Sequence, residues 1–308
     1  MKLGFVGAGV VGTALSVSLA AKGYSVVAVG SRTRASAERL AERLPGCRAL
    51  SLQEVADEAD LVFVTTPDDA IAGVVADLRW HAGQAVVHCS GAASTDVLAP
   101  ARSAGAIVGG FHPLQTFASP EQAIQNLPGT TFALEAEPPL LDHLATLATA
   151  LGGTWVRLRP EEKVLYHAAA VFASNYLVTL VKLATDLWRE FGVETPEATR
   201  ALLPLLQGTL NNLGRVGLPR CLTGPIARGD VGTVRRHLAA LERSAPGGML
   251  ETYRRLGCET IQIGVAKGTL DPARAEELGR LLGERTSPGY ETPSGGRRCE
   301  SPSARSGR

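Results

Sequence analysis

Cysteine is scarce in this chain of 308 residues, and its spacing supports neither a disulfide framework nor a metal site. The five cysteines are an odd number, and none forms a C-x-x-C pair or a Cys/His arrangement of the kind that holds zinc. Such usage favours reduced thiols in a cytoplasmic protein and predicts no bound metal. A thiol role for Cys89, or a thiol- or metal-dependent hydrolase, has no supporting spacing.

An excess of charge of either sign is missing as well. The 31 lysines and arginines nearly balance the 30 aspartates and glutamates, for a formal net charge of +1. This balance suggests neither nucleic acid nor an anionic membrane as a partner. We expect no membrane span, which needs about 18 apolar residues, because the best stretch, Tyr166–Ala184, contains polar residues such as His167 and Lys182. Met1-Lys2 leads directly into the first predicted strand, so we expect no signal peptide.

Aromatic residues are few, at 5%, whereas apolar residues make up 45% of the chain and charged residues 20%. This composition supports a sizeable core of alanine- and glycine-rich, closely packed elements. Residues 286–308 depart from it, since they are mostly serine, proline, glycine and arginine. A segment of that kind buries too little apolar surface to fold alone, so we expect it to be disordered.

A glycine-rich turn opens the chain. Leu3–Val6 predicts a buried strand, and Thr13–Gly23 predicts a helix that ends at a glycine. Between them stands the G-x-G-x-x-G sequence Gly7-Ala8-Gly9-Val10-Val11-Gly12. Strand, glycine turn and helix in this order are typical of a dinucleotide-binding fold, in which the first glycine permits the turn, the second admits the pyrophosphate and the third lets helix and strand pack closely. The pyrophosphate would lie at the helix N-terminus, where free N–H groups favour an anion.

The second predicted strand, Ser25–Val29, ends without an acidic residue. An NAD-binding chain usually has Asp or Glu here, about 20 residues beyond the glycines, to bond the ribose 2′-OH. This chain has Gly30-Ser31-Arg32-Thr33-Arg34 instead, and its first acid is Glu38. Because hydroxyl and guanidinium groups suit a phosphate, we predict NADP as the cofactor, with Ser31, Arg32 and Thr33 around its 2′-phosphate. The alternative is the solvated start of a helix.

Strand and helix patterns alternate through the first half and predict an α/β fold with a Rossmann-type, doubly wound, mostly parallel sheet. From Glu161 onward the pattern is helical only, and Arg159-Pro160 is the expected boundary. We therefore predict a Rossmann NADP-binding domain at 1–159, an all-helical substrate and dimerisation domain at 160–285 and the tail at 286–308. Further strands are expected at 47–50, 61–64, 85–88, 106–110, 130–134 and 154–158, and helices at 161–191, 197–213, 231–240, 249–267 and 272–282.

Three predicted loops lie where ligands of open α/β sheets bind, outside the carboxyl ends of the strands. Thr65-Thr66-Pro67 follows the fourth strand, Ser90-Gly91 the fifth and His112 the sixth. We predict that Thr65, Thr66, Pro67, Ser90 and Gly91 contact the cofactor, and that Ser90 also contacts substrate. Pro67 is equally explained as an ordinary strand terminator.

The architecture resembles the superfamily that contains 6-phosphogluconate dehydrogenase, ketopantoate reductase, pyrroline-5-carboxylate reductase and prephenate dehydrogenase, in which a Rossmann domain precedes a helical domain. Four motifs look more specifically like a bacterial family of Rossmann-like proteins whose C-terminal domain has no known function. The motifs are His88-Cys89-Ser90-Gly91, Gly109–Gln115, Tyr166–Ala170 with Ser174-Asn175-Tyr176, and Leu222–Asp230. The resemblance covers about residues 1–285 and implies an oligomeric oxidoreductase.

His112 is the first candidate for acid–base chemistry. A histidine with a pKa near about 6.5 exchanges protons at neutral pH. Reduction of a carbonyl or imine needs a proton donor beside the hydride donor, so we predict that His112 donates this proton or binds substrate. Its likeness to the His-Pro of prephenate dehydrogenases supports the role. The alternative is a histidine that bonds the loop backbone, and His88 is better explained as a buried core residue.

Lys163, His167 and Asn175 are spaced so that they share one face of the first long helix. Polar groups on such a face are costly to bury unless they are satisfied, and contact with substrate would satisfy them. The ketopantoate reductases and hydroxyacid dehydrogenases that the chain resembles carry a lysine one turn before an asparagine. Asn175 fits that asparagine, but Val171 stands in place of the lysine. The lysine is therefore absent or replaced by His167, and we predict that Asn175 contacts substrate.

The stretch Thr223–Asp230 is rich in turn residues and carries two further candidates. Thr223 would donate a hydrogen bond to substrate, and Arg228 would bind its anionic group. The alternative is helix punctuation, in which Gly224-Pro225 breaks one helix and Asp230 caps the next or pairs with Arg228. Ketopantoate reductases carry a glutamate shortly after a similar loop, and this chain has none there.

Together these features predict an NADP-dependent oxidoreductase acting on the CH–OH or C=N group of a small, anionic oxo acid or imino acid. His112, Asn175, His167 and Thr223 are the predicted catalytic residues, and ketopantoate-type reduction is the preferred example, on the resemblance alone. The alternative is a regulatory or sensor protein that binds NADP without turnover. Apolar faces of the helical half predict a homodimer.

Overall fold

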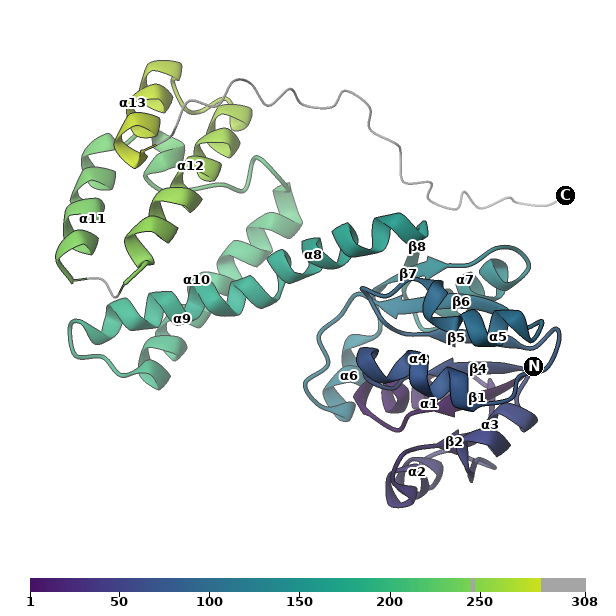
Figure 1. The fold of residues 1–308 in the computed structure, drawn as a ribbon. Helices are drawn as coiled ribbons and strands as arrows, with labels where there is room; N and C mark the ends of the chain where they lie inside the picture. Colours follow the sequence, from purple (N-terminus) through teal and green to yellow (C-terminus); the bar gives the residue numbers. More distant parts are fainter. Residues whose placement is uncertain (245–246, 284–308) are drawn as a thin grey trace, which may run out of the picture. The chain divides into compact units, whose positions relative to one another are not determined.

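The computed structural model describes residues 1–244 and 247–283, so the predicted disordered tail lies outside the described residues. In the described part, one eight-stranded sheet has the order β3-β2-β1-β4-β5-β6-β7-β8 (Figure 1). The strands are β1 (Lys2–Val6), β2 (Ser25–Gly30), β3 (Arg48–Ala49), β4 (Leu61–Val64), β5 (Ala85–His88), β6 (Ile107–Pro113), β7 (Thr131–Glu135) and β8 (Thr154–Arg157).

Neighbouring strands are parallel except for β6 and β7, which are antiparallel. This confirms the predicted Rossmann-type, mostly parallel sheet. The chain order reverses between β1 and β4, and open α/β sheets bind ligands at the carboxyl ends of the strands beside such a reversal. The glycine turn therefore lies where a ligand is expected.

The central strands are buried because they are apolar and because helices cover both faces of the sheet. On one face, the rings of Phe5 and Phe63 stack with centroids 4.9 Å apart, and Phe111 and Phe132 continue the row. These four rings are fully buried. The row spans β1, β4, β6 and β7, so it fixes the register of the strands whose ends form the candidate site.

The helices of the first half divide between the two faces of the sheet. One hydrophobic cluster includes residues of α1, α2, α6 and α7, and a second includes residues of α3, α4 and α5. This division confirms the doubly wound arrangement. The helices are α1 (Val10–Ala21), α2 (Arg34–Ala41), α3 (Leu52–Glu58), α4 (Asp68–Asp77), α5 (Ala99–Ser103), α6 (Pro120–Asn126) and α7 (Leu140–Ala150), with a short 3-10 turn η1 (Thr95–Leu98) before α5.

After β8 the described chain is helical, as expected. The predicted helix 161–191 is interrupted at Ser174, which separates α8 from α9. The elements are η2 (Pro160–Glu162), α8 (Lys163–Ala173), α9 (Asn175–Arg189), α10 (Thr195–Val216), η3 (Ile226–Arg228), α11 (Val231–Ser244), α12 (Met249–Lys267) and α13 (Pro272–Leu282).

The chain forms two compact units, Met1–Thr179 and the part from Leu180 onward. This division falls later than the change from strands to helices near Pro160, because α8 contacts the sheet and belongs with it. The second unit has its own core, which includes Val234 on α11, Ile261 on α12 and Leu278 on α13. The expected boundary at Arg159-Pro160 thus marks a change of secondary structure rather than a break in packing.

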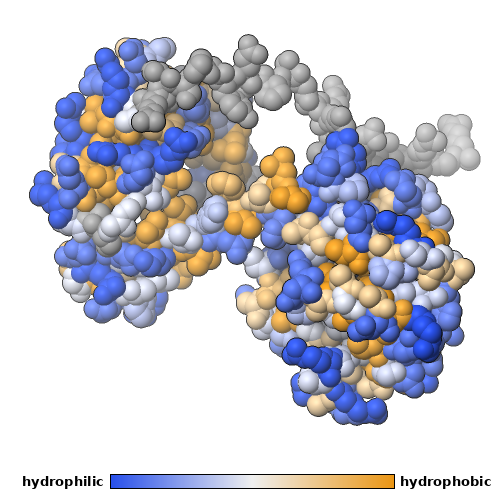
Figure 2. All heavy atoms as spheres, in the orientation of Figure 1, coloured by the Kyte–Doolittle hydropathy of each residue, from blue (hydrophilic) through white to orange (hydrophobic). Residues whose placement is uncertain are grey.

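Helices α8 and α9 expose much apolar surface. By length and composition the stretch Pro160–Arg189 could cross a membrane, with a mean hydropathy of 1.5 in its most apolar window, none of which is buried. This differs from our expectation that no stretch of the chain is apolar enough to cross a membrane. Figure 2 shows hydrophobic side chains on the surface of the helical part of the chain. A surface of this kind marks contact with another protein or with a membrane.

Candidate active site

The turn between β1 and α1 depends on two glycines that leave no room for a side chain. Gly7 has a φ of 118°, and a Cβ atom added there would lie 2.7 Å from the backbone carbon of Thr65. A Cβ atom at Gly12 would lie 2.3 Å from the carbonyl oxygen of Gly7. The hydroxyl of Thr65 donates to that same oxygen at 2.8 Å. Thr65 therefore braces the turn, and its hydroxyl is not free for the cofactor contact expected of it.

Gly9 leaves open space above the turn, since a Cβ atom added there would meet nothing within 4 Å. Gly9 is also the N-cap of α1, and N–H groups in the first turn of a helix lack partners within the helix. The Oγ1 atom of Thr66 is buried without a hydrogen-bond partner among the described residues. Open space over free N–H groups, near an unsatisfied hydroxyl, fits the pyrophosphate of a dinucleotide.

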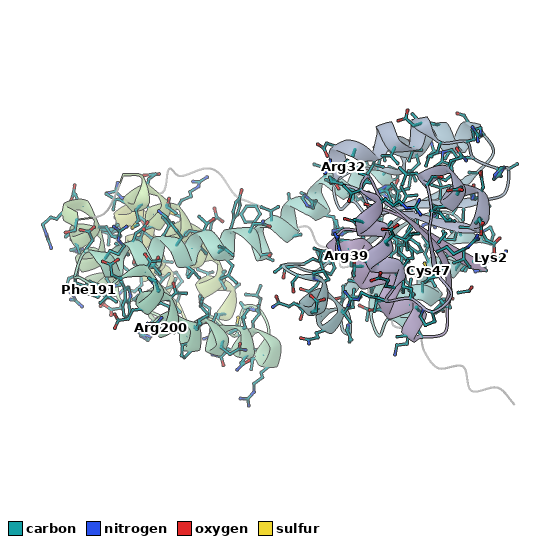
Figure 3. All side chains as sticks on the ribbon, turned by 90° about the horizontal axis from the view of Figure 1, so that it is seen from below. Lys2, Arg32, Arg39, Cys47, Phe191 and Arg200 are labelled. Atoms are coloured by element: carbon teal, nitrogen blue, oxygen red, sulfur yellow. The ribbon has the colours of Figure 1, made fainter. Side chains whose placement is uncertain are left out.

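The residues after β2 carry hydroxyl and guanidinium groups, some of which are already bonded. Arg32 is exposed (Figure 3), and within the described ranges its side chain makes no ion pair or hydrogen bond. Arg34, by contrast, pairs with Glu38 at 2.8 Å. Thr33 donates a hydrogen bond to Oγ of Ser36 at 2.7 Å. Arg32 is thus available for a 2′-phosphate, whereas Arg34 is already paired.

A hollow of about 450 Å³ lies beside the glycine turn. Its lining includes Ala8 from the turn and Ser36, Arg39 and Arg43 from the region of α2. Arg39 donates to Oγ of Ser36 at 3.0 Å, and Figure 3 labels Arg39 on α2. The hollow therefore offers room beside the turn, with hydroxyl and guanidinium donors at its wall.

Ser90 organises the loop after β5. Its side chain is buried, its Oγ donates to Asp68 Oδ2 at 2.6 Å, and the same oxygen accepts the N–H groups of Ala92 and Ala93 at 3.2 and 3.0 Å. We expected Ser90-Gly91 to bond the nicotinamide or the substrate, and this stays a prediction. The hydroxyl of Ser90 gives its proton to Asp68, so this side chain ties the loop to the start of α4.

His112 and two residues of α8 meet at the end of β6. His112 Nδ1 and the hydroxyl of Tyr166 are hydrogen-bonded at 2.8 Å, and the ring of His167 lies 6.5 Å from that of His112 between centroids. Gly91 is buried against both histidines, because a Cβ atom there would lie 2.7 Å from His112 Nε2 and 2.8 Å from His167 Cδ2. The structure thus brings together Gly91, His112 and His167 from the predicted set.

Both partners of the His112–Tyr166 hydrogen bond are uncharged at neutral pH. Burial, followed by the charges of Lys163 and His167, lowers the pKa of His112 from 6.5 to about 4. The sequence had suggested a histidine of ordinary pKa that donates a proton or binds substrate. Burial raises the pKa of Tyr166 to about 12, so the phenol keeps its proton at neutral pH. It donates to Nδ1 when the imidazole carries its hydrogen on Nε2.

Lys163, at the start of α8, and Glu135 form a buried ion pair. Nζ of Lys163 is 3.4 Å from Oε2 of Glu135 and donates to the carbonyl oxygen of Ser90 at 3.1 Å. Burial lowers the pKa of Lys163, and Glu135 opposes that shift. His88 is fully buried nearby, its Nδ1 accepts the N–H of Ser90, and burial lowers its pKa to about 3. His88 is thus a buried neutral residue, as expected.

The other predicted residues lie elsewhere. Asn175 is exposed at the first residue of α9, beyond the break at Ser174. Thr223 and Arg228 belong to the second unit, where the turn around them is held by Lys267, whose Nζ donates to the carbonyl of Leu222 at 2.7 Å. The roles of Asn175, Thr223 and Arg228 toward a substrate stay predictions.

The turn before α11 agrees with the alternative explanation of Thr223–Asp230, in which these residues end one helix and cap the next. Asp230 accepts the N–H and the hydroxyl of Thr233 at 3.0 and 2.7 Å, so it caps α11. These hydrogen bonds are the main cause that lowers the pKa of Asp230, and the charges of Arg236 and Arg228 add to it. Asp230 therefore acts first as a cap.

Three residues beside His112 had no assigned role in the sequence analysis, namely Asp68, Glu135 and Tyr166. Tyr166 stands one turn after Lys163 on α8 and beside His167, so the helical spacing that singled out Lys163 and His167 also points to it. Asp68 and Glu135 carry no comparable local signal. Cys89 has no site role to add, since the described cysteines are free and burial raises the pKa of its thiol to about 12.

Two family descriptions match parts of the chain. Residues 1–113 match the Rossmann-like domain, and residues 130–260 match a domain of unknown function named DUF2520. Among curated proteins, none matches this chain.

Solved structures resemble this chain over most of its length. A protein from Thermotoga maritima is 26% identical, with a TM-score of 0.71 over 86% of this chain and 99% of that one. A Bacteroides fragilis protein described as an NADP oxidoreductase is 25% identical, with a TM-score of 0.66 over 85% and 98% of the two chains. A reductive aminase from Aspergillus terreus in complex with NADPH and ethyl levulinate is 19% identical, with a TM-score of 0.62 over 91% and 99%, and shares the fold. The predicted cofactor, NADP, agrees with these descriptions.

Proposed function

We propose that this chain is an NADP(H)-dependent reductase that acts on a C=N or C=O group of a small molecule. The observation that carries the proposal is the His112–Tyr166 hydrogen bond, which places a phenol and a neutral imidazole at the strand ends of a sheet that begins with a dinucleotide turn. The descriptions of the similar structures as an NADP oxidoreductase and a reductive aminase support it.

The cofactor proposal rests on three features, which are the first turn of α1, the hydroxyl of Thr66 and the side chain of Arg32. The first turn of α1 at Gly9 would hold the pyrophosphate, and Thr66 would satisfy its buried hydroxyl on the cofactor. Arg32, exposed and unpaired in the described part of the chain, would hold the 2′-phosphate that distinguishes NADP from NAD. When bound, NADPH supplies the hydride of the reduction.

Tyr166 and His112 would supply the proton. Reduction of a C=N or C=O group leaves a basic nitrogen or oxygen that needs one. The phenol of Tyr166 keeps its proton at neutral pH, and a shift of its hydrogen bond from His112 Nδ1 to the substrate atom would deliver it. His112 is then the neutral partner that orients the phenol, and Gly91 holds the imidazole in place from its other side.

The charges beside this pair favour an imine as the substrate class. Asp68 carries an exposed carboxylate near His112, while the nearby cation Lys163 is buried against Glu135. As the proton of Tyr166 reaches the nitrogen of an imine, that nitrogen gains positive charge. A nearby carboxylate stabilises this charge, whereas it repels the anionic group of an oxo acid. Arg228 stays the predicted partner for an acidic group. Imines and imino acids are therefore our first substrates, and oxo acids, with ketopantoate as the example, are second.

The proposal is tested by following NADPH absorbance with purified protein. A panel of cyclic imines, imino acids, ketones mixed with small amines, and ketopantoate separates the substrate classes. We expect turnover of a C=N substrate that Tyr166→Phe lowers strongly while NADPH affinity is retained. Turnover of ketopantoate alone would support the oxo acid instead. NADPH binding without turnover of any compound would leave the sensor alternative.

We also propose that the chain forms a homodimer through the apolar surface of α8 and α9. Val164, Leu165 and Phe172 on α8 and Val178 on α9 are more than two-thirds exposed, and a second copy that presents the same residues would cover them. Light scattering in the absence of detergent tests this. A monomer that sediments with lipid vesicles would support a membrane contact of Pro160–Arg189 instead.

A further inference from the structure

Helix α8 docks on the sheet through one buried lysine. Lys163, the first residue of α8, is 2% exposed, whereas the next two residues, Val164 and Leu165, are 71% and 77% exposed. An ammonium group taken out of water needs compensating contacts. It finds them in the carboxylate of Glu135 and the carbonyl oxygen of Ser90. The start of α8 is thus fixed by polar contacts rather than by apolar packing.

The ion pair holds both ends of the loop that follows β5. Lys163 bonds the carbonyl of Ser90, where the loop begins. Oε1 of Glu135 accepts the N–H and the hydroxyl of Thr95, each at 2.8 Å, where the loop ends. One buried pair therefore fixes loop 90–95 between α8 and β7.

This loop contains the residue that supports His112. Gly91 directly follows the carbonyl that Lys163 holds, and it lies against Nε2 of His112. On β6, a Cβ atom at Gly110 would lie 3.2 Å from Nζ of Lys163, so glycine makes room for the ammonium two residues before His112. Lys163 thus contacts the loop and the strand that support His112.

We propose that Lys163 is a positioning residue: through Ser90 and the Glu135 pair it holds loop 90–95, and with it Gly91, against the His112–Tyr166 pair. The inference deepens the proposed reductase, because the orientation of His112 is what aims the Tyr166 phenol. The same helix carries Lys163, Tyr166 and His167 on one face, so docking α8 by its first residue also places the other two.

The pKa of His112 depends on whether Lys163 holds loop 90–95 in place. The groups that face His112 are Lys163 and His167, which lower its pKa, Asp68, which raises it, the hydroxyl of Tyr166, and His88, whose own pKa is lowered by His112. Its burial is the largest cause of the shift. Loss of Lys163 removes one depressing charge and, if the loop loosens, part of the burial. Both changes raise the pKa of His112.

The test is a histidine NMR titration of the free protein with the double substitution Lys163→Met and Glu135→Leu. Replacing both partners leaves no uncompensated buried charge, so the fold should be retained. We expect the His112 midpoint to rise from about 4 toward 6.5. The amides of Ala92 and Ala93, which bond Ser90 Oγ, should exchange faster with solvent, while those of the central strand β1 stay protected. His112→Gln assigns the resonance.

Lys182→Met is the matched control, because Lys182 is an exposed lysine of α9 paired with Asp186; it should leave the His112 midpoint unchanged. A folded double variant whose His112 titrates as in the parent overturns the proposal. Neither measurement needs cofactor or substrate, so the result stands even if no reductase activity is found. Where activity is measurable, kcat should fall while the KM for NADPH stays near that of the parent.

Discussion

The two buried histidines of the first unit are held in their neutral forms. Burial lowers the pKa of His88 to about 3 and that of His112 to about 4, against an ordinary value of 6.5 that unfolding restores. Below pH 6.5 the unfolded chain therefore binds protons that the folded chain does not. Stability rises with pH wherever the unfolded state binds more protons.

We accordingly expect the free energy of unfolding to be at its full value above pH 6.5 and to fall as the pH drops from 6.5 toward 4. The loss should be about 1.4 kcal/mol per pH unit for each histidine that stays neutral. Urea unfolding at about pH 7.5 and about pH 5 measures it. His112→Gln should reduce the difference, whereas His143→Gln, at an exposed position, should not. Equal stability at the two pH values would contradict the prediction.

Arg32 is the residue on which cofactor choice depends. We expect Arg32→Ala to weaken NADPH binding by about tenfold or more, about 1.4 kcal/mol, and to leave NADH binding unchanged, because only NADPH carries the 2′-phosphate. Fluorescence titration with both cofactors measures this. Arg34→Ala is the control, since Arg34 is paired with Glu38. If both variants lose the same affinity, Arg32 has no special role.

The residues that sequence reasoning found are those whose function depends on local backbone. Gly7 and Gly12 stand out by spacing alone, and the structure shows why a side chain does not fit at either. Tyr166 bonds His112 from 54 positions away, and Lys163 meets Glu135 across 28 positions. Those pairings depend on how α8 docks on the sheet, which no local pattern encodes.

At the scale of elements, substitutions at two glycines of the turn between β1 and α1 test cofactor binding and folding separately. Gly9→Ala places a Cβ atom in open space, so the protein should fold normally but lose NADPH affinity, because the methyl group occupies the room for the pyrophosphate. Gly12→Ala drives a Cβ atom into the carbonyl of Gly7 and should lower the temperature at which the first unit unfolds. Thermal unfolding and NADPH titration of both variants check the pair. A Gly9→Ala variant that binds NADPH as tightly as the parent would argue against this turn as the site.

The strands were predictable because they are apolar runs bounded by turn residues, and those at 61–64 and 85–88 match β4 and β5 residue for residue. The antiparallel direction of β7 could not be predicted, because an apolar run does not indicate whether its strand is parallel or antiparallel to its neighbour. The break between α8 and α9 was missed for a similar reason. Ser174, where the helix breaks, is neither proline nor glycine, and helical spacing continues across it.

At the scale of the whole molecule, the apolar surface of α8 and α9 predicts self-association. We expect Leu165→Glu to shift the protein from dimer toward monomer, because a carboxylate would be buried between the two copies. Sedimentation over a range of protein concentrations measures the shift. Leu114→Glu, at a partly exposed apolar residue outside the helical part, should leave the dimer intact. A parent protein that is monomeric at every concentration would contradict the prediction.

The division into two compact units bears on how the chain loses its structure. Two hydrophobic clusters lie on the faces of the sheet in the first unit, and a third lies in the second unit. Chains of more than one cooperative unit generally do not unfold in one all-or-none step. A single melting temperature would then describe neither unit. A substitution near His112 should move one part of the heat-capacity curve and leave the other in place.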